Sequence, residues 1–167
     1  MTITKLLNLP SGKKNLLIVG IGNTLKSDDG AGPETIKNLK LKIKNGVIPS
    51  EARNLAFLDV GIAPENYTKQ IKELKPETIV FIDAVEMKEP SGTVKIIDEK
   101  DISSGFFTTH NMPLNLFLDY IEEETKARIV FIGIQPESIR FGEGLSAPVQ
   151  KAVGILVDEI LNRCKST

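Results

Sequence analysis

The sequence predicts an α/β fold, in which one domain over residues 1–167 forms a three-layer α/β/α sandwich. Its central sheet is expected to be twisted, mostly parallel and made of about five strands. Two observations predict this fold. Short apolar runs that do not alternate with polar residues recur along the chain, as in parallel strands buried on both faces. Segments with helical apolar spacing lie between these runs, so strands and helices alternate.

Four of the apolar runs are predicted to be buried parallel strands. They are rich in Ile, Val, Leu and Phe, and they span Leu16–Gly20, Leu55–Val60, Thr78–Asp83 and Arg128–Gly133. A fifth run, Thr93–Asp98, alternates more and follows the turn-forming letters KEPSG. It is therefore predicted to be a hairpin-like partner or an edge strand.

Four helices are predicted between and after the strands, and each carries an apolar stripe on one face. The first follows Pro33, a residue suited to a first helical position. The expected helices are Glu34–Lys44, Pro64–Leu74, Pro113–Glu123 and about Ala147–Cys164. Their stripes comprise Ile36, Leu39 and Ile43; Tyr67, Ile71 and Leu74; Leu114, Phe117, Leu118 and Ile121; and Val149, Val153, Leu156, Val157, Ile160 and Leu161.

The charge balance excludes several classes of partner. Lys and Arg number 21 and Asp and Glu number 22, which gives a formal net charge of −1. No global basic field favours nucleic acid or an anionic membrane. The longest apolar runs are too short to cross a bilayer, and the N-terminus lacks the apolar stretch of a signal peptide, so we expect a cytoplasmic protein.

The single cysteine, Cys164, cannot form an internal disulfide and is expected to be an ordinary thiol.

A glycine-rich segment, GIGNTLKSDDGAGP, spans Gly20–Pro33 after the first strand. A dinucleotide-binding fingerprint would need a third glycine at position 25, where the chain has Leu25, and the adjacent Asp28 and Asp29 would repel a pyrophosphate. A plain turn, with acids near a helix N-terminus, is the simpler alternative. Neighbouring side chains point in different directions, so one aspartate could face a crevice while the other hydrogen-bonds the loop.

Two further residues could reach the same edge of the sheet. Asp83 follows the apolar letters VFI at the end of the third strand, and His110, the only histidine, lies in the link FFTTHNMPL. Ligands bind such folds at the carboxyl ends of the strands. A divalent transition metal could be bound at this edge by two carboxylates and one imidazole, those of Asp29, Asp83 and His110. Such a set leaves coordination positions open for water or substrate. Backbone capping by Asp83 and an ordinary hydrogen-bonding role for His110 are the alternatives.

Other catalytic arrangements fit the sequence less well. A serine hydrolase would need a G-x-S-x-G elbow, which is absent. A cysteine hydrolase would have to use Cys164 on a distal helix. Neither an HExxH helix nor a CxxC pair occurs, so the common proteolytic and structural zinc signatures are missing.

Four segments together resemble the hydrogenase maturation endopeptidases: GIGNTLKSDDGAGP, FIDAVEMKEPSGTV, TTHNMPL and GIQPESIRFGEGLS. The likeness is strongest to the branch that processes large subunits of energy-converting or formate-linked nickel-iron hydrogenases. It runs from about Leu16 to the last helix, and residues 1–13 form an N-terminal extension outside it. The resemblance implies that Asp29, Asp83 and His110 are both the catalytic and the metal-contacting residues. It also matches Asn23 to a glycine-asparagine pair, and we expect its side chain to shape the loop.

The resemblance implies an aspartic or metal-dependent endopeptidase (EC 3.4.23-type). Its partner would be the hydrogenase large-subunit precursor, from which it removes a C-terminal extension. Nickel would be supplied by that precursor, and zinc or cadmium could replace it in a crystal. We expect a monomer. Two alternatives are a nickel chaperone or checkpoint protein that cuts nothing, and a nucleotide-binding α/β protein.

Overall fold

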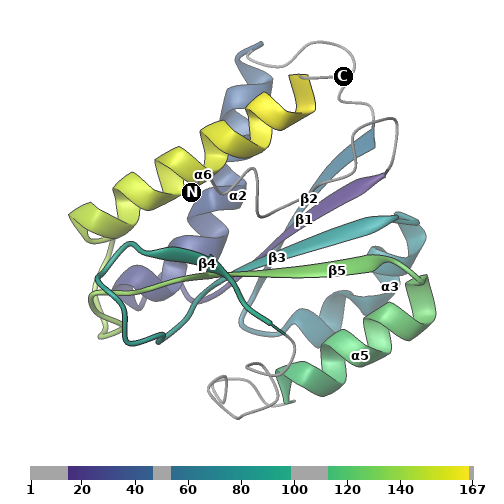
Figure 1. Cartoon of the computed structure of the whole chain (residues 1–167), viewed down its shortest axis with the longest axis horizontal. Coiled ribbons are helices and arrows are strands. Elements are labelled where there is room, and N and C mark those ends of the chain that lie inside the picture. The colour runs from purple at the N-terminus through teal and green to yellow at the C-terminus, as the bar shows by residue number, and fades with distance from the viewer. Residues whose placement is uncertain (1–14, 47–53, 99–112, 166–167) are drawn as a thin grey trace.

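The computed structural model describes residues 15–46, 54–98 and 113–165, and it shows a five-stranded sheet between two layers of helices (Figure 1). The strand order across the sheet is β2-β1-β3-β5-β4. The strands are β1 (Leu16–Ile21), β2 (Leu55–Gly61), β3 (Thr78–Ala84), β4 (Val94–Ile96) and β5 (Arg128–Ile134). The α/β/α prediction is confirmed, and the four predicted buried strands are found within one or two residues of their expected ends.

The sheet is parallel except at one edge. β1 pairs with β2 and with β3, and β3 pairs with β5, all in parallel. β4 pairs with β5 in the antiparallel direction, which confirms the edge-strand prediction for the fifth run. This strand is shorter than expected, because regular pairing covers only Val94–Ile96.

Each face of the sheet carries its own core. On one face, α2 (Ala31–Lys44) and α6 (Ala147–Lys165) pack on strand residues such as Ile18, Val80 and Ile132. On the other, α3 (Thr68–Glu73) and α5 (Leu114–Thr125) cover residues such as Leu17, Phe81 and Phe131. Figure 1 shows these helix pairs on opposite sides of the strands. Because successive strand residues point to opposite faces, runs covered on both sides have no polar alternation.

The first helix begins earlier than predicted. A 3₁₀ turn, η1 (Ser27–Gly30), leads directly into α2, which starts at Ala31. Pro33 is therefore the third helical residue rather than the one before the helix. Proline is tolerated there because the N–H groups of the first turn have no acceptor inside the helix.

The second predicted helix is divided into two parts. A 3₁₀ turn, η3 (Pro64–Tyr67), precedes α3, which ends at Glu73. The prediction that Leu74 belongs to the buried stripe is wrong, since this side chain is 38% exposed. The helix stops because Lys75 adopts a positive φ of 46° and the next residue, Pro76, disfavours helical backbone before it.

The stripes of the last two helices are buried as predicted. In α5, Pro113 is the N-cap residue, and Lys126, which has left-handed backbone, is the C-cap residue after the last helical residue, Thr125. Within the described ranges, no helix is both long enough and apolar enough to cross a membrane.

Candidate functional site

Two predicted site residues flank the point where the strand order reverses. β1 has β2 on one side and β3 on the other, and in such sheets this reversal opens a crevice at the carboxyl ends of the strands. Asp29 lies in η1, which follows β1, and Asp83 is the last residue but one of β3. η1 is in contact with β3. The two carboxylates thus come from elements that touch at the place where this fold binds ligands.

Asp28 is the member of the acidic pair that hydrogen-bonds the loops. Its side chain is fully buried and accepts four hydrogen bonds from the segment after β5. The backbone N–H groups of Glu137 and Ser138 donate to Oδ2 at 2.8 and 3.1 Å. Ser146 donates its N–H to Oδ1 at 2.7 Å and its hydroxyl to Oδ2 at 2.9 Å. A fully buried carboxylate that accepts four hydrogen bonds from one segment is a structural anchor.

Asp29 is placed differently. Its side chain is half-buried, and Oδ2 accepts a hydrogen bond from the Asn23 N–H at 3.0 Å. No residue of the described segments donates a hydrogen bond to Oδ1. Asn23 in turn accepts a hydrogen bond on its own Oδ1 from the Leu25 N–H at 2.9 Å, which confirms that its side chain shapes the loop. Asp29 is therefore oriented through one oxygen, and its other oxygen can contact a ligand.

Asp83 is buried at the end of β3, with 5% of its surface exposed. Its Oδ1 accepts a hydrogen bond from the Ala84 N–H at 2.8 Å. The sequence predicted a carboxylate that emerges from a dry environment and needs a partner, and the structure places it in such surroundings. The backbone bond is the capping role considered as the alternative. Since a carboxylate has several acceptor positions, this bond is compatible with a ligand as well.

The third predicted residue, His110, lies outside the described residues. Of the parts that are described, no three His, Cys, Asp or Glu side chains form a group able to hold a metal ion. The metal site of Asp29, Asp83 and His110 therefore stays a prediction. Two of its three predicted ligands, the carboxylates, lie on elements that contact each other. Oxygen donors and one imidazole suit a divalent transition metal.

Gln135 is a residue whose role the sequence analysis missed. It follows β5 directly and is buried. Its Oε1 accepts hydrogen bonds from the N–H groups of Met87 at 2.7 Å and Glu89 at 3.3 Å, while Nε2 donates to both carboxylate oxygens of Glu86 at 3.1 Å. Gln135 thus holds the segment that follows Asp83. The signal was the same as for Asp83: a polar residue directly after a buried apolar strand.

The glycines of the loop serve the packing of the chain on itself. Gly22 has a φ of +143°, and a Cβ there would lie 1.8 Å from the carbonyl oxygen of Asp29. A Cβ on Gly32 would lie 2.2 Å from the Ile21 oxygen and 2.5 Å from the Ile82 oxygen. Gly22 lets η1 approach the end of β1 closely, and Gly32 lets α2 approach β1 and β3. Their presence is explained without a bound pyrophosphate, which removes the main support for the nucleotide-binding alternative.

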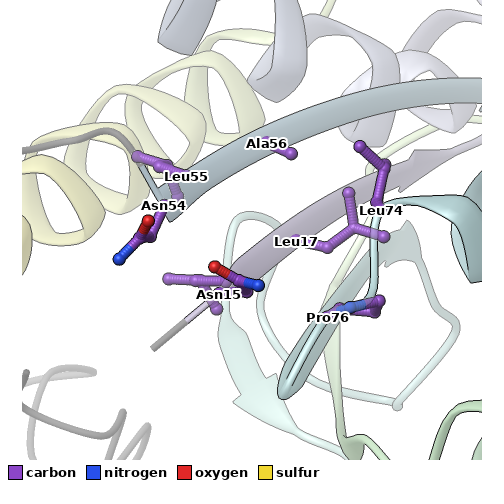
Figure 2. Close-up of a pocket in the computed structure, with 8 residues that line it drawn as sticks. Asn15, Leu17, Asn54, Leu55, Ala56, Leu74 and Pro76 are labelled. Carbon is purple, nitrogen blue, oxygen red and sulfur yellow. The ribbon is translucent and has the colours of Figure 1, made fainter. Parts of the chain in front are cut away.

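A pocket elsewhere on the molecule does not match the predicted site. Figure 2 shows this pocket, which lies at the amino ends of β1 and β2. Its volume is about 130 Å³, and Asp29 and Asp83 lie at the other, carboxyl ends of the strands. No described residue that lines the pocket carries a carboxylate, thiol or imidazole. The lining residues are Asn15, Leu16, Leu17, Asn54, Leu55, Ala56, Leu74 and Pro76. These described residues have only amide, aliphatic and proline side chains, which supply no group for acid-base or metal chemistry.

Comparison with known proteins identifies the family. A model of the HycI hydrogenase maturation protease family matches residues 36–163. The hydrogenase 3 maturation protease of Escherichia coli K12 is 36% identical over 138 residues, covering 82% of this chain and 83% of that protein. The chain belongs to the hydrogenase maturation protease family. This membership makes it a peptidase of hydrogenase maturation.

Solved structures agree with the assignment to this family of maturation proteases. The crystal structure of the NiFe hydrogenase maturation protease HycI from Thermococcus kodakarensis is similar with a TM-score of 0.82 at 29% identity, over 98% of this chain and 99% of that one. The solution structure of the endopeptidase HycI from Escherichia coli gives 0.72 at 34% identity, over 86% and 87%. The resemblance inferred from the four sequence segments is confirmed.

Proposed function

We propose that this maturation protease removes the C-terminal extension of a nickel-loaded NiFe hydrogenase large-subunit precursor. In this proposal, nickel arrives as part of the substrate, and Asp29, Asp83 and His110 contact it. The observation that carries the proposal is the placement of Asp29 and Asp83 on touching elements at the reversal of strand order. Family membership supplies the reaction class, and the similar Thermococcus protein is a maturation protease of NiFe hydrogenase.

The described residues suit an ion that comes and goes with a substrate. Asp29 is half-buried and keeps Oδ1 without a hydrogen-bond donor among the described residues, so it can meet an incoming group. Asp83 is fixed by the Ala84 N–H in a nearly dry position, where a carboxylate gains strongly from a cation. A sparse set of two carboxylates and one imidazole fits recognition of an ion that is already held by its own ligands.

Hydrolysis of the peptide bond requires a water oxygen to add to the carbonyl carbon, and the leaving nitrogen must gain a proton. A carboxylate at the crevice can accept the proton from water and return one to the amine. When bound, the ion would mark a loaded precursor and could also polarise the carbonyl. We propose that its main role is recognition, because the docked ion positions the scissile bond beside Asp29 and Asp83.

Mass spectrometry of the precursor tests the proposal. Incubation of the protease with nickel-loaded precursor should release one discrete C-terminal peptide, and nickel-free precursor should stay intact. Transfer of nickel with no change in precursor mass would contradict cleavage and support the chaperone alternative. Equal cleavage of both precursor forms would contradict the role of nickel.

A second experiment separates recognition by nickel from catalysis by nickel. In this experiment, zinc or cadmium replaces nickel in the loaded precursor, and the rate of cleavage is compared with that of the nickel form. A comparable rate would mean that the identity of the metal matters little to the chemistry. Recognition through simple coordination predicts that such a substituted precursor still binds, with a Kd close to that of the nickel form. Loss of binding together with cleavage would contradict that role.

A further inference from the structure

Exposed apolar side chains gather on two loops beside the candidate site. Phe141 is 82% exposed, Leu25 61% and Ile139 51%. Leu25 belongs to the loop after β1, and the other two belong to the loop after β5. Together with the adjacent Lys26 and Arg140 we call these residues the Leu25–Phe141 patch. Apolar groups concentrated on one part of a surface mark a site of interaction, whereas single exposed residues do not.

The two loops form one backbone unit. Lys26 and Gly142 pair as a short parallel bridge. The Ser27 N–H donates to the Gly142 oxygen at 2.8 Å, and the Gly142 N–H donates to the Leu25 oxygen at 3.0 Å. The Ser27 hydroxyl also donates to the Arg140 oxygen at 3.0 Å. The Lys26 ammonium lies 5.4 Å from the centre of the Phe141 ring, so side chains from the two loops meet.

Hydrogen bonds to the buried Asp28 carboxylate hold this unit in place. Asp28 accepts bonds from Glu137, Ser138 and Ser146, which bracket the exposed part of the second loop. Because the loop is fixed by these bonds, it cannot rearrange to bury the Phe141 ring, which stays exposed to water. Because the surface is already ordered, binding of a partner costs this loop little conformational entropy, which favours affinity.

Position and charge indicate what covers the patch. Asp29 lies in the turn that directly follows Lys26, so the patch is continuous with the candidate site. Lys26 and Arg140 form no ion pair with any carboxylate of the described residues. A complementary partner therefore combines apolar side chains with at least one carboxylate and lies next to a bond held at Asp29.

We propose that the Leu25–Phe141 patch binds the segment of the large-subunit precursor that flanks the cleavage point. This inference rests on the proposed function for the identity of the partner. An apolar side chain of the precursor packs on Phe141 and Leu25, and an acidic one approaches Lys26 and Arg140. The patch thus contributes to substrate affinity and leaves the chemical step to the carboxylates.

Kinetics and binding of matched variants test this surface. Phe141→Ser and the double variant Lys26→Glu/Arg140→Glu are compared with Leu116→Ser, a control that is 56% exposed on α5. The substrate is the nickel-loaded large-subunit precursor of the source organism. For the patch variants, KM should rise about tenfold or more while kcat stays within about twofold. Leu116→Ser should match the unmodified chain. When the patch variants are combined with Asp83→Asn, the precursor Kd should rise by a similar factor relative to Asp83→Asn alone.

The outcomes separate this inference from the proposed function. If the unmodified chain cleaves the precursor and Phe141→Ser has the same KM and Kd as Leu116→Ser, the patch proposal is overturned. If the chain binds the precursor, loses that binding in Phe141→Ser and never cleaves, the patch stands and the protease proposal fails. If the chain neither binds nor cleaves the precursor, both are overturned. A dimer in light scattering that Phe141→Ser converts to monomer would assign the patch to a second copy and overturn the proposal.

Discussion

Asp28 and Ser146 are 118 residues apart in the chain and are joined by two hydrogen bonds, from the Ser146 N–H at 2.7 Å and from its hydroxyl at 2.9 Å. This contact fastens the loop after β5 to the turn that carries Asp29. The first aspartate of the pair therefore holds the architecture of the rim, whereas the second keeps one carboxylate oxygen without a donor among the described residues. The Asp28 carboxylate also orders the loop that presents Phe141.

Replacing Asp28 with Asn should destabilise the protein. An amide keeps one acceptor oxygen, so at least one of the N–H or O–H donors around it would face an NH₂ group. The free energy of unfolding should fall by about 1–3 kcal/mol, the cost of leaving a donor of this partly buried network unpaired. Urea denaturation measures this change. Asp119→Asn on the exposed face of α5 is the control and should change stability by less than about 0.5 kcal/mol. Equal stability of the two variants would contradict the anchoring role.

Asp29→Asn, Asp83→Asn and His110→Ala should each abolish processing of the precursor. Asn at position 83 retains the oxygen that accepts the Ala84 N–H, so the melting temperature should stay within a few degrees of that of the unmodified chain. A gel assay of the precursor measures processing. Asp59→Asn is a matched control, because Asp59 also accepts a backbone bond near the end of a strand, from Gly61. Full activity in a site variant would count against the site.

Gly32→Ala should separate α2 from the sheet. The added Cβ would come within 2.5 Å of two backbone oxygens, which cannot move aside as a flexible side chain can. We expect a loss of about 1–3 kcal/mol, or more if the helix cannot shift. Gly154→Ala on α6 is the matched control, since a Cβ there meets nothing within 4 Å. It should stabilise by about 0.5–1 kcal/mol because glycine is a poor helix former. A stable Gly32→Ala variant would contradict close packing as the reason for this glycine.

The free protease should purify with far less than one nickel ion per chain. The described residues supply two carboxylates and no group of three metal ligands, and recognition requires no resident ion. Elemental analysis of the purified chain, before and after exposure to a chelator, measures its nickel content. Stoichiometric nickel that survives chelation would show a resident metal centre and contradict delivery by the substrate.

The sequence by itself determined the fold class, because the short apolar runs of β1, β3 and β5, rich in β-branched residues and separated by helical patterns, are typical of strands covered on both faces. It also singled out Asp83, since a carboxylate directly after a buried strand must end at an edge of the sheet. Helix boundaries were less well predicted. The start of α2 and the early end of α3 depend on 3₁₀ turns and on a positive φ at Lys75, which have weak local signals.

Only the tertiary structure decided which aspartate of the pair anchors the loops, and it alone assigned a role to Gln135. Both answers depend on donors that lie 46 to 118 residues away in the chain. Periodicity and turn chemistry report on neighbours within a few residues, so they carry no information about such partners. The order of the strands brings those distant segments together, and hydrogen bonding of buried polar groups then fixes each side chain.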